Sequence, residues 1–246
     1  MKENFLRIPN SPEGKVSLAA AGNYPKIIDA LENEGIKTLS FRNKILSEEV
    51  SRHSDMLLCH TGGEYIFCEP KLNTDILTKE GFTVNFSEEL GEEYPFDVKL
   101  NTAVTEDHFI CNKKSIDKAL FDFFIASGKK PIFTNQGYTK CSVCFVTENA
   151  VITEDNSIYE ALKDTSFDVL LISKGDIYLS DKHCGFLGGS TGKLDKNTLA
   201  VTGELKYHRD RDIILRFCEK HEVEIKELIK GRITDIGGIL PLKEMR

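Results

Sequence analysis

The segment from Tyr138 to Ser173, "YTKCSVCFVTENAVITEDNSIYEALKDTSFDVLLIS", carries the clearest pattern of strands and helix in the chain. Residues 138–146 and 150–153 are apolar, strand-like runs separated by a polar turn. Residues 156–166 carry apolar side chains at helical spacing, and residues 168–173 form a third apolar run. The segment therefore predicts a hairpin, then a helix, then a further strand.

The same order of elements recurs along the chain. Further copies occupy residues 53–86, 94–134 and 186–228. A fifth copy is split, because residues 233–242 supply its first strand and residues 15–41 supply the remaining strands and the helix. Comparable positions of the five copies recur at intervals of roughly 45 residues, at Asp55, Asp97, Lys140, Gly188 and Asp235.

A unit shared between the two ends of a chain is the usual way for a circular array of repeats to close. We therefore predict an α/β fold in which residues 1–246 form a single domain. In this domain, five strand-strand-helix-strand units surround a central channel as a five-fold pseudosymmetric α/β propeller. The alternative is a generic α/β sandwich whose hairpins resemble one another by chance.

The order of these units, with its terminally split member, resembles the pentein fold. That fold is the α/β propeller of guanidino-group-modifying enzymes, such as arginine and agmatine deiminases, dimethylarginine hydrolases and amidinotransferases, and of the ribosome anti-association factor. Four segments also resemble an uncharacterised bacterial group of that fold: "YPFDVKLN" (94–101), "GYTKCSVCFV" (137–146), "GFLGGSTGKLD" (185–195) and "DIGGILPL" (235–242). The resemblance extends over nearly the whole chain.

Composition excludes several classes of partner. The 246 residues carry a net charge of -7, and no basic patch is evident, which argues against nucleic acid or an anionic membrane as the main partner. No apolar run approaches the ~20 residues of a membrane span, and residues 1–14 lack the features of a signal peptide. We expect a cytoplasmic protein with a small-molecule ligand, and the sequence leaves its oligomeric state open.

The seven cysteines have irregular spacing, and several lie in apolar runs, so we expect buried free thiols rather than a disulfide framework. The pair in "CSVC", Cys141 and Cys144, is predicted to lie within a strand, where the two side chains would point to opposite faces. A zinc site would need a second ligand pair, and only His183-Cys184 offers one. We therefore predict no metal and no cofactor.

The segment "GFLGGSTGKLD" superficially resembles a phosphate-binding loop. The residue after Lys193 is Leu194 rather than Ser or Thr, and Gly188 stands one position too late for the motif. The segment also continues as strand, turn and strand instead of opening a helix. We interpret it as part of the fourth repeat, whose small residues allow close packing at the centre of the ring.

The resemblance implies that the ligand site lies in the central channel, among residues of the five first strands. Its enzymes use a cysteine nucleophile from the last first strand, a histidine and guanidinium-binding carboxylates. This sequence departs from that pattern, because "DIGGILPL" contains no cysteine and "GGSTG" contains no histidine. The remaining candidates for substrate binding are Asp55, Asp97, Asn101, Lys140, Ser190 and Asp235.

A relocated thiol is the alternative nucleophile. Cys141 follows Lys140, whose ammonium group is expected to lower the thiol pKa, and His53 or His60 could lie across the channel as the acid or base. The opposing interpretation is that Cys141 only fills the core. The sequence thus leaves open an enzyme of the hydrolase or amidinotransferase type acting on a guanidine- or amidine-like cation, or a non-enzymatic binding protein like the anti-association factor. If the repeat is accidental, the protein is a different α/β enzyme.

Overall fold

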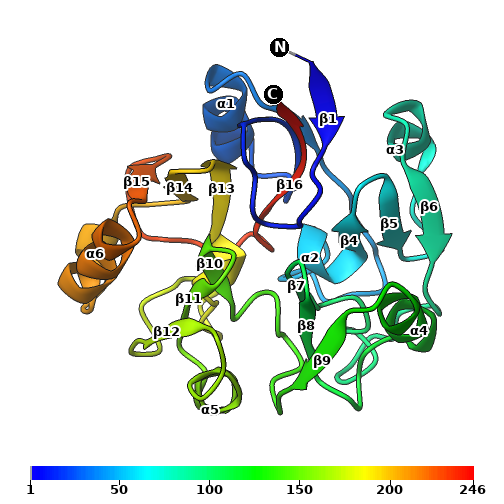
Figure 1. The fold of residues 1–246 in the computed structure, drawn as a ribbon. Helices are drawn as coiled ribbons and strands as arrows, with labels where there is room; N and C mark the ends of the chain where they lie inside the picture. The colour runs from blue at the N-terminus through cyan, green and yellow to red at the C-terminus, as the bar shows by residue number, and fades with distance from the viewer. Residues whose placement is uncertain (1) are drawn as a thin grey trace.

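The computed structural model describes residues 2–246 and contains five small sheets arranged around a common centre (Figure 1). In each sheet the first strand of the unit is antiparallel to the second, and the second is parallel to the third. A helix connects the two parallel strands of every unit. The predicted five-fold α/β propeller, the pentein fold, is therefore confirmed.

The units share one plan and follow one another around the centre, with the split unit last. The first strands are β4 (Leu58–Gly62), β7 (Ala103–Val104), β10 (Cys144–Thr147), β13 (Thr191–Asp195) and β16 (Ile239–Met245). The second strands are β5 (Tyr65–Cys68), β8 (His108–Cys111), β11 (Ala150–Thr153), β14 (Thr198–Val201) and β2 (Lys15–Ala21). The third strands are β6 (Thr83–Phe86), β9 (Lys130–Phe133), β12 (Asp168–Leu171), β15 (Glu224–Glu227) and β3 (Lys37–Leu39).

The connecting helices are α3 (Asp75–Lys79), α4 (Lys118–Ala126), α5 (Asn156–Leu162), α6 (Arg211–Lys220) and α1 (Pro25–Asn33). Outside this plan lie strand β1 (Glu3–Phe5), helix α2 (Ser54–Leu57) and the 3₁₀ turns η1 (Gly188–Ser190) and η2 (Leu205–Tyr207). The ends of the longer helices follow local chemistry. Asp117 caps α4 by accepting the Leu120 N–H, and Pro25 starts α1 with the backbone angle that a first turn requires.

The two chain ends complete the split unit together. Strand β16 from the C-terminus pairs with β2 on one side and with β1 on the other. The backbone of Lys2 and Arg246 exchanges two hydrogen bonds, at 2.7 and 3.1 Å, and Figure 1 shows the two termini side by side. The ring is therefore closed by β pairing between the first and last segments of the chain.

The strands nearest the centre begin later than the sequence predicts. His53 and Asp55 lie at the start of helix α2, and Asp97 and Asn101 lie in the irregular segment before β7. The "CSVC" prediction is wrong in the same way, because Cys141 lies in a turn that precedes β10. The reason is that these segments bond to the neighbouring units instead of continuing a ladder within their own sheet.

These bonds form a closed circuit that we call the central ring. It consists of the Asp55 N–H to the Gly237 carbonyl (3.2 Å), Asn101 Nδ2 to the Asp55 carbonyl (3.1 Å), the Cys141 N–H to Asn101 Oδ1 (3.2 Å), the Gly189 N–H to the Cys141 carbonyl (2.8 Å) and the Ile236 N–H to the Gly189 carbonyl (2.9 Å). Every unit contributes to the ring, so the five turns hold one another in place.

Among residues 2–246, no helix is long and apolar enough to cross a membrane.

Candidate functional site

A cavity of about 420 Å³ opens on one side of the central ring, and we call it the acidic cavity. Its walls come from loops of several units and include five carboxylates: Glu49, Glu92, Glu93, Asp97 and Asp235. Of the described residues that line it, none is a lysine or an arginine. Carboxylates that share a concave site favour a cationic occupant.

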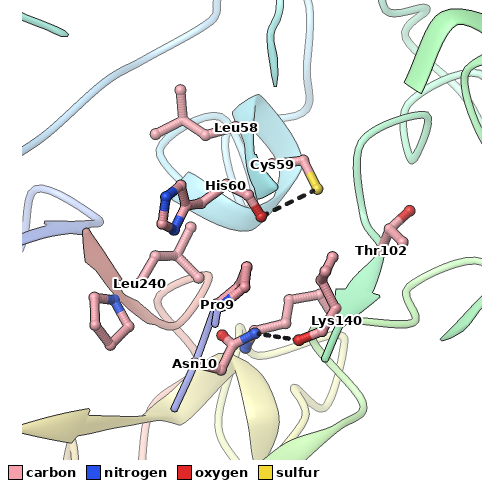
Figure 2. A pocket seen from close by; sticks show the side chains of 10 residues that line it. Pro9, Asn10, Leu58, Cys59, His60, Thr102, Lys140 and Leu240 are labelled. Atoms are coloured by element: carbon pink, nitrogen blue, oxygen red, sulfur yellow. Dashed lines mark hydrogen bonds between the residues drawn. The ribbon is translucent and has the colours of Figure 1, made fainter. Parts of the chain in front are cut away.

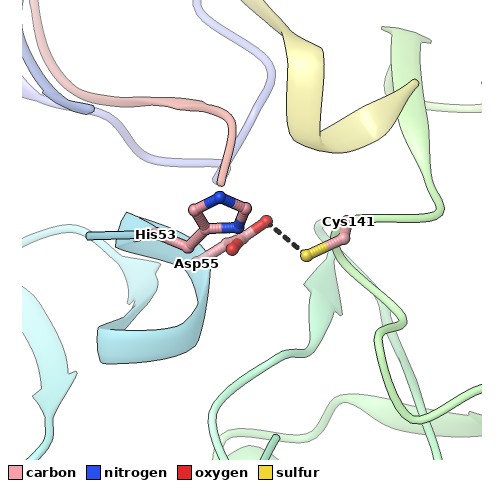
Figure 3. A group of neighbouring side chains, drawn as sticks. All are labelled: His53, Asp55 and Cys141. Atoms are coloured by element: carbon pink, nitrogen blue, oxygen red, sulfur yellow. Dashed lines mark hydrogen bonds between the residues drawn. The ribbon is translucent and has the colours of Figure 1, made fainter. Parts of the chain in front are cut away.

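Cys141 and His53 also line the acidic cavity, and Asp55 lies beside them (Figure 3). The Cys141 thiol donates to Asp55 Oδ2 over 2.9 Å and accepts a hydrogen bond from Asn101 Nδ2 over 3.2 Å. All four side chains are buried, at 2 % exposure or less. Helix α2 and the turn before β10 thus bring together a thiol, an imidazole and a carboxylate from two units.

Asp235 completes this group from the split unit. Its Oδ1 lies 3.6 Å from His53 Nδ1, and its carboxylate accepts the backbone N–H groups of Phe186 (2.9 Å) and Gly237 (3.0 Å). A Cβ on Gly189 would lie 2.1 Å from Asp235 Oδ1, so only glycine leaves room for this carboxylate. The glycines of "GFLGGSTG" therefore serve close packing, as the sequence predicts.

The electrostatics at Cys141 differ from the prediction. Burial, followed by the neighbouring charges of Asp55 and Asp235, raises the pKa of the Cys141 thiol well above its ordinary value. Burial also raises the pKa of Asp55. The expected lowering of the Cys141 pKa by Lys140 is wrong, because burial and two carboxylates outweigh the adjacent lysine. The thiol is therefore protonated at neutral pH.

Lys140 and His60 line a second, narrow pocket of about 20 Å³ instead (Figure 2). His60 lies on β4, where its Nε2 donates to the Gly63 carbonyl over 2.9 Å. Burial lowers the pKa of His60 to about 4, so the ring is neutral at physiological pH. The structure brings His53 to Cys141 and does not bring His60 there, so His60 is not part of the acidic cavity.

Asp97 borders the cavity together with an aromatic wall that sequence reasoning missed. Tyr138 donates its hydroxyl to Asp97 Oδ2 over 2.7 Å, whereas Asp97 Oδ1 is buried without a hydrogen-bond partner. The Tyr138 ring stacks between Tyr94 and Phe186, at centroid distances of 6.1 and 6.2 Å. These aromatic residues lie in loops of three different segments, so no periodic pattern in the sequence marks them.

Asn101 and Ser190 have roles in the frame of the site rather than on its surface. Asn101 Oδ1 accepts the N–H groups of Lys140 (2.7 Å) and Cys141 (3.2 Å), which fixes the turn that presents the thiol. Ser190 is fully buried, and its hydroxyl donates to the Leu187 carbonyl over 2.9 Å. The cysteines follow the prediction, because all seven are free and only Cys184 is exposed.

Glu154, which follows β11, is a buried carboxyl group close to the site. Its Oε1 accepts the Leu187 N–H over 2.7 Å, while its Oε2 has no hydrogen-bond partner. Burial raises its pKa from 4.5 to about 8. The folded state therefore holds this proton more tightly than the unfolded chain does. The contribution of the protonated Glu154 carboxyl group to the stability of the fold is fully present below pH 4.5 and is lost as the pH rises through about 8.

Replacing Glu154 by glutamine should remove this loss, because the amide oxygen keeps the Leu187 hydrogen bond and carries no titrating proton. We expect the free energy of unfolding of the variant to exceed that of the wild type by a few kcal/mol at about pH 9 and to approach it at about pH 5. Urea unfolding at both pH values measures this difference. The exposed Glu160→Gln on α5 is the control, and equal differences at the two pH values would contradict the expectation.

Residues 20–240 match the model of a protein family described as "Family of unknown function (DUF6873)". The chain belongs to this family. The match covers four of the five repeats and most of the split unit, including every residue of the central ring. No curated protein sequence matches the chain.

Solved structures resemble this DUF6873 chain at the level of the fold. An inosamine-phosphate amidinotransferase from Streptomyces griseus superposes with a TM-score of 0.56 at 11% identity, covering 96% of each chain. Agmatine deiminase from C. jejuni superposes with a TM-score of 0.54 at 11% identity, and the alignment covers 93% of this chain and 91% of the deiminase. The amidinotransferase SxtG from Microseira wollei superposes with a TM-score of 0.51 at 8% identity, and the alignment covers 90% of this chain and 91% of SxtG. These similarities support the pentein fold and leave the reaction of this chain to be argued from its own site.

Proposed function

We propose that this protein binds a small molecule with a guanidinium or amidinium group in the acidic cavity. The observation that carries the proposal is that carboxylates surround a thiol and an imidazole in this cavity. None of the described residues that line it is a lysine or an arginine. Proteins of the same fold include an agmatine deiminase and amidinotransferases. A planar cation suits paired carboxylates because each of its N–H groups can donate to an oxygen.

The buried Oδ1 of Asp97 lacks a hydrogen-bond partner, so it is available to such a cation. Tyr94 and Phe186, which flank the Tyr138 ring on either side, line the same cavity and offer aromatic surface to a planar cation. Asp235 lines the same cavity from the split unit. The ligand would therefore lie between carboxylates from two units, with its central carbon facing Cys141.

We further propose a chemical step at this carbon. A bound cation next to Cys141 offsets the carboxylates that raise the thiol pKa, so ligand binding itself favours the thiolate. The sulfur then forms a bond to the guanidinium carbon, and the thiol proton passes by way of Asp55 and His53 to the departing amine as the bond between that amine and the carbon breaks. Water as the second nucleophile gives hydrolysis, whereas an amine gives amidino transfer.

Binding is tested by titrating guanidine, agmatine and arginine into metal-free protein in a calorimeter. Asp97→Asn should weaken the affinity for the guanidinium group about tenfold or more, because a charge-assisted hydrogen bond contributes roughly 1.5–3 kcal/mol. Asp122→Asn, on the exposed side of α4, changes the net charge equally and is the control. Equal weakening by both variants would show that only the overall charge attracts the ligand.

A non-enzymatic binding protein is the second candidate, and the protonated state of the Cys141 thiol favours it. The two candidates differ in the fate of the ligand. Mass spectrometry of the ligand after long incubation should detect a urea or an exchanged amidine product if Cys141 reacts, and Cys141→Ala should abolish that product while the ligand still binds. Ligand that is bound by the wild type and recovered unchanged would establish the binding protein.

A further inference from the structure

His53, Asp55 and Cys141 form a cluster that has a use beyond guanidinium chemistry. One nitrogen, oxygen or sulfur atom from each of these residues lies within 4.8 Å of the corresponding atom of the other two. Figure 3 shows the imidazole and the carboxylate on one side and the thiol facing them from the other. The three residues come from helix α2 and the turn before β10, both of which are held by the central ring.

The cluster contains polar atoms that the protein itself does not satisfy. His53 Nε2 and Asp55 Oδ1 are both buried without a hydrogen-bond partner. Buried polar atoms without partners are uncommon in folded proteins and are costly where they occur. Two such atoms on adjacent members of one cluster indicate that the site is built for a species that supplies the missing interactions.

We propose that His53, Asp55 and Cys141 form a binding site for a thiophilic divalent cation of the zinc class. A thiolate, an imidazole and a carboxylate are typical ligands of Zn²⁺, whereas Mg²⁺ and Ca²⁺ prefer sites composed only of oxygen ligands. Binding releases the thiol proton to solvent. The thiolate and the Asp55 carboxylate then balance the two positive charges of the ion.

The geometry requires only small adjustments. With metal–ligand bonds of about 2.0–2.3 Å, the ligand atoms of a tetrahedral zinc site lie roughly 3–4 Å apart. Cys141 Sγ and Asp55 Oδ2 are 2.9 Å apart, and the other pairs are within 4.8 Å, so shifts of about 1 Å suffice. The fourth position is on the side of the acidic cavity, where Asp235 Oδ1, 3.6 Å from His53 Nδ1, or a water molecule completes the tetrahedron.

The metal site and the proposed guanidinium site cannot be occupied together. Both use the Cys141 sulfur, and the charge of a bound ion would repel a second cation in the same cavity. Zinc should therefore displace a guanidinium ligand and block alkylation of the thiol. The metal proposal does not depend on the proposed function, because metal binding is measured without any guanidino compound, and guanidinium binding is measured with a chelator present.

The test uses the full chain after treatment with a chelator. Titration with Zn²⁺ should show one equivalent bound with micromolar or tighter affinity. Co²⁺ should produce the near-ultraviolet charge-transfer band of a thiolate ligand. Cys141→Ser should abolish this band, and Asp55→Asn should weaken zinc binding roughly 10–100-fold while circular dichroism confirms that the variant is folded.

Cys184→Ser is the matched control, because Cys184 is the exposed thiol that lines the same cavity next to His183. This variant should retain the cobalt band and the zinc affinity of the wild type. Loss of the band in Cys184→Ser, with retention in Cys141→Ser, would place the metal at the mouth of the cavity and overturn the proposal. Absence of stoichiometric zinc binding by the folded wild type would overturn it as well.

Discussion

Gly237→Ala should lower the free energy of unfolding by about 3 kcal/mol or more, a far larger loss than that caused by Gly35→Ala. Both glycines have positive φ, at 76° for Gly237 and 80° for Gly35, so alanine is strained to a similar extent at either position. They differ in their surroundings. A Cβ on Gly237 would lie 2.3 Å from the Cα and Cβ of His53, whereas a Cβ on Gly35 would meet nothing within 4 Å.

The comparison separates two causes of destabilisation. Gly35→Ala reports the cost of the backbone conformation alone, roughly 1 kcal/mol, and the remainder in Gly237→Ala reports the displacement of His53. Urea unfolding of both variants measures the difference. Gly237→Ala should also lose zinc binding, because the Gly237 carbonyl accepts the backbone N–H of Asp55, one of the proposed zinc ligands. Equal losses of stability in the two variants would mean that the contact with His53 is easily relieved.

Asn101→Ala should also be strongly destabilising, by about 3–5 kcal/mol. The side chain is buried and joins three units, because it donates to the Asp55 carbonyl and accepts the N–H groups of Lys140 and Cys141. Alanine cannot replace these bonds. The loss comes from several backbone groups that stay buried without a partner.

Asn73→Ala is the control, because Asn73 Oδ1 also accepts a backbone N–H, that of Asp75, but does so in solvent. There, water replaces the lost bond, so a change of about 1 kcal/mol or less is expected. Chemical denaturation of both variants provides the comparison. A small effect at Asn101 would indicate that the central ring contributes little to stability.

The fold could be predicted because each repeat carries its own periodic pattern of apolar residues. The apolar run in "AVIT" and the helical spacing in "NSIYEALKDTS" are local signals. The strand forms as β11, and the helix begins at Asn156 as predicted but ends at Leu162, four residues early. The split unit was also predictable, since the segment at residues 233–242 lacks a partner strand unless the N-terminal segment supplies one.

The site was harder to predict because it is made of turns rather than strands. The sequence named His53, Asp55, Asp235 and Cys141 as channel residues, and the structure places them together. It could not show that Lys140 and Cys141, adjacent in the chain, face different pockets. The direction of a side chain within a turn depends on φ and ψ, which apolar periodicity does not encode.

The central ring also lies next to two pockets of very different size. Residues just before the first strands, such as His53, Asp97 and Cys141, face the acidic cavity, while residues on those strands, such as His60 and Leu240, face the narrow pocket. No described residue lines both pockets, and the turns of the central ring contribute residues to each of them. The narrow pocket, at about 20 Å³, has room for no more than a water-sized molecule, so a ligand of the proposed kind would have to approach the ring from the side of the acidic cavity.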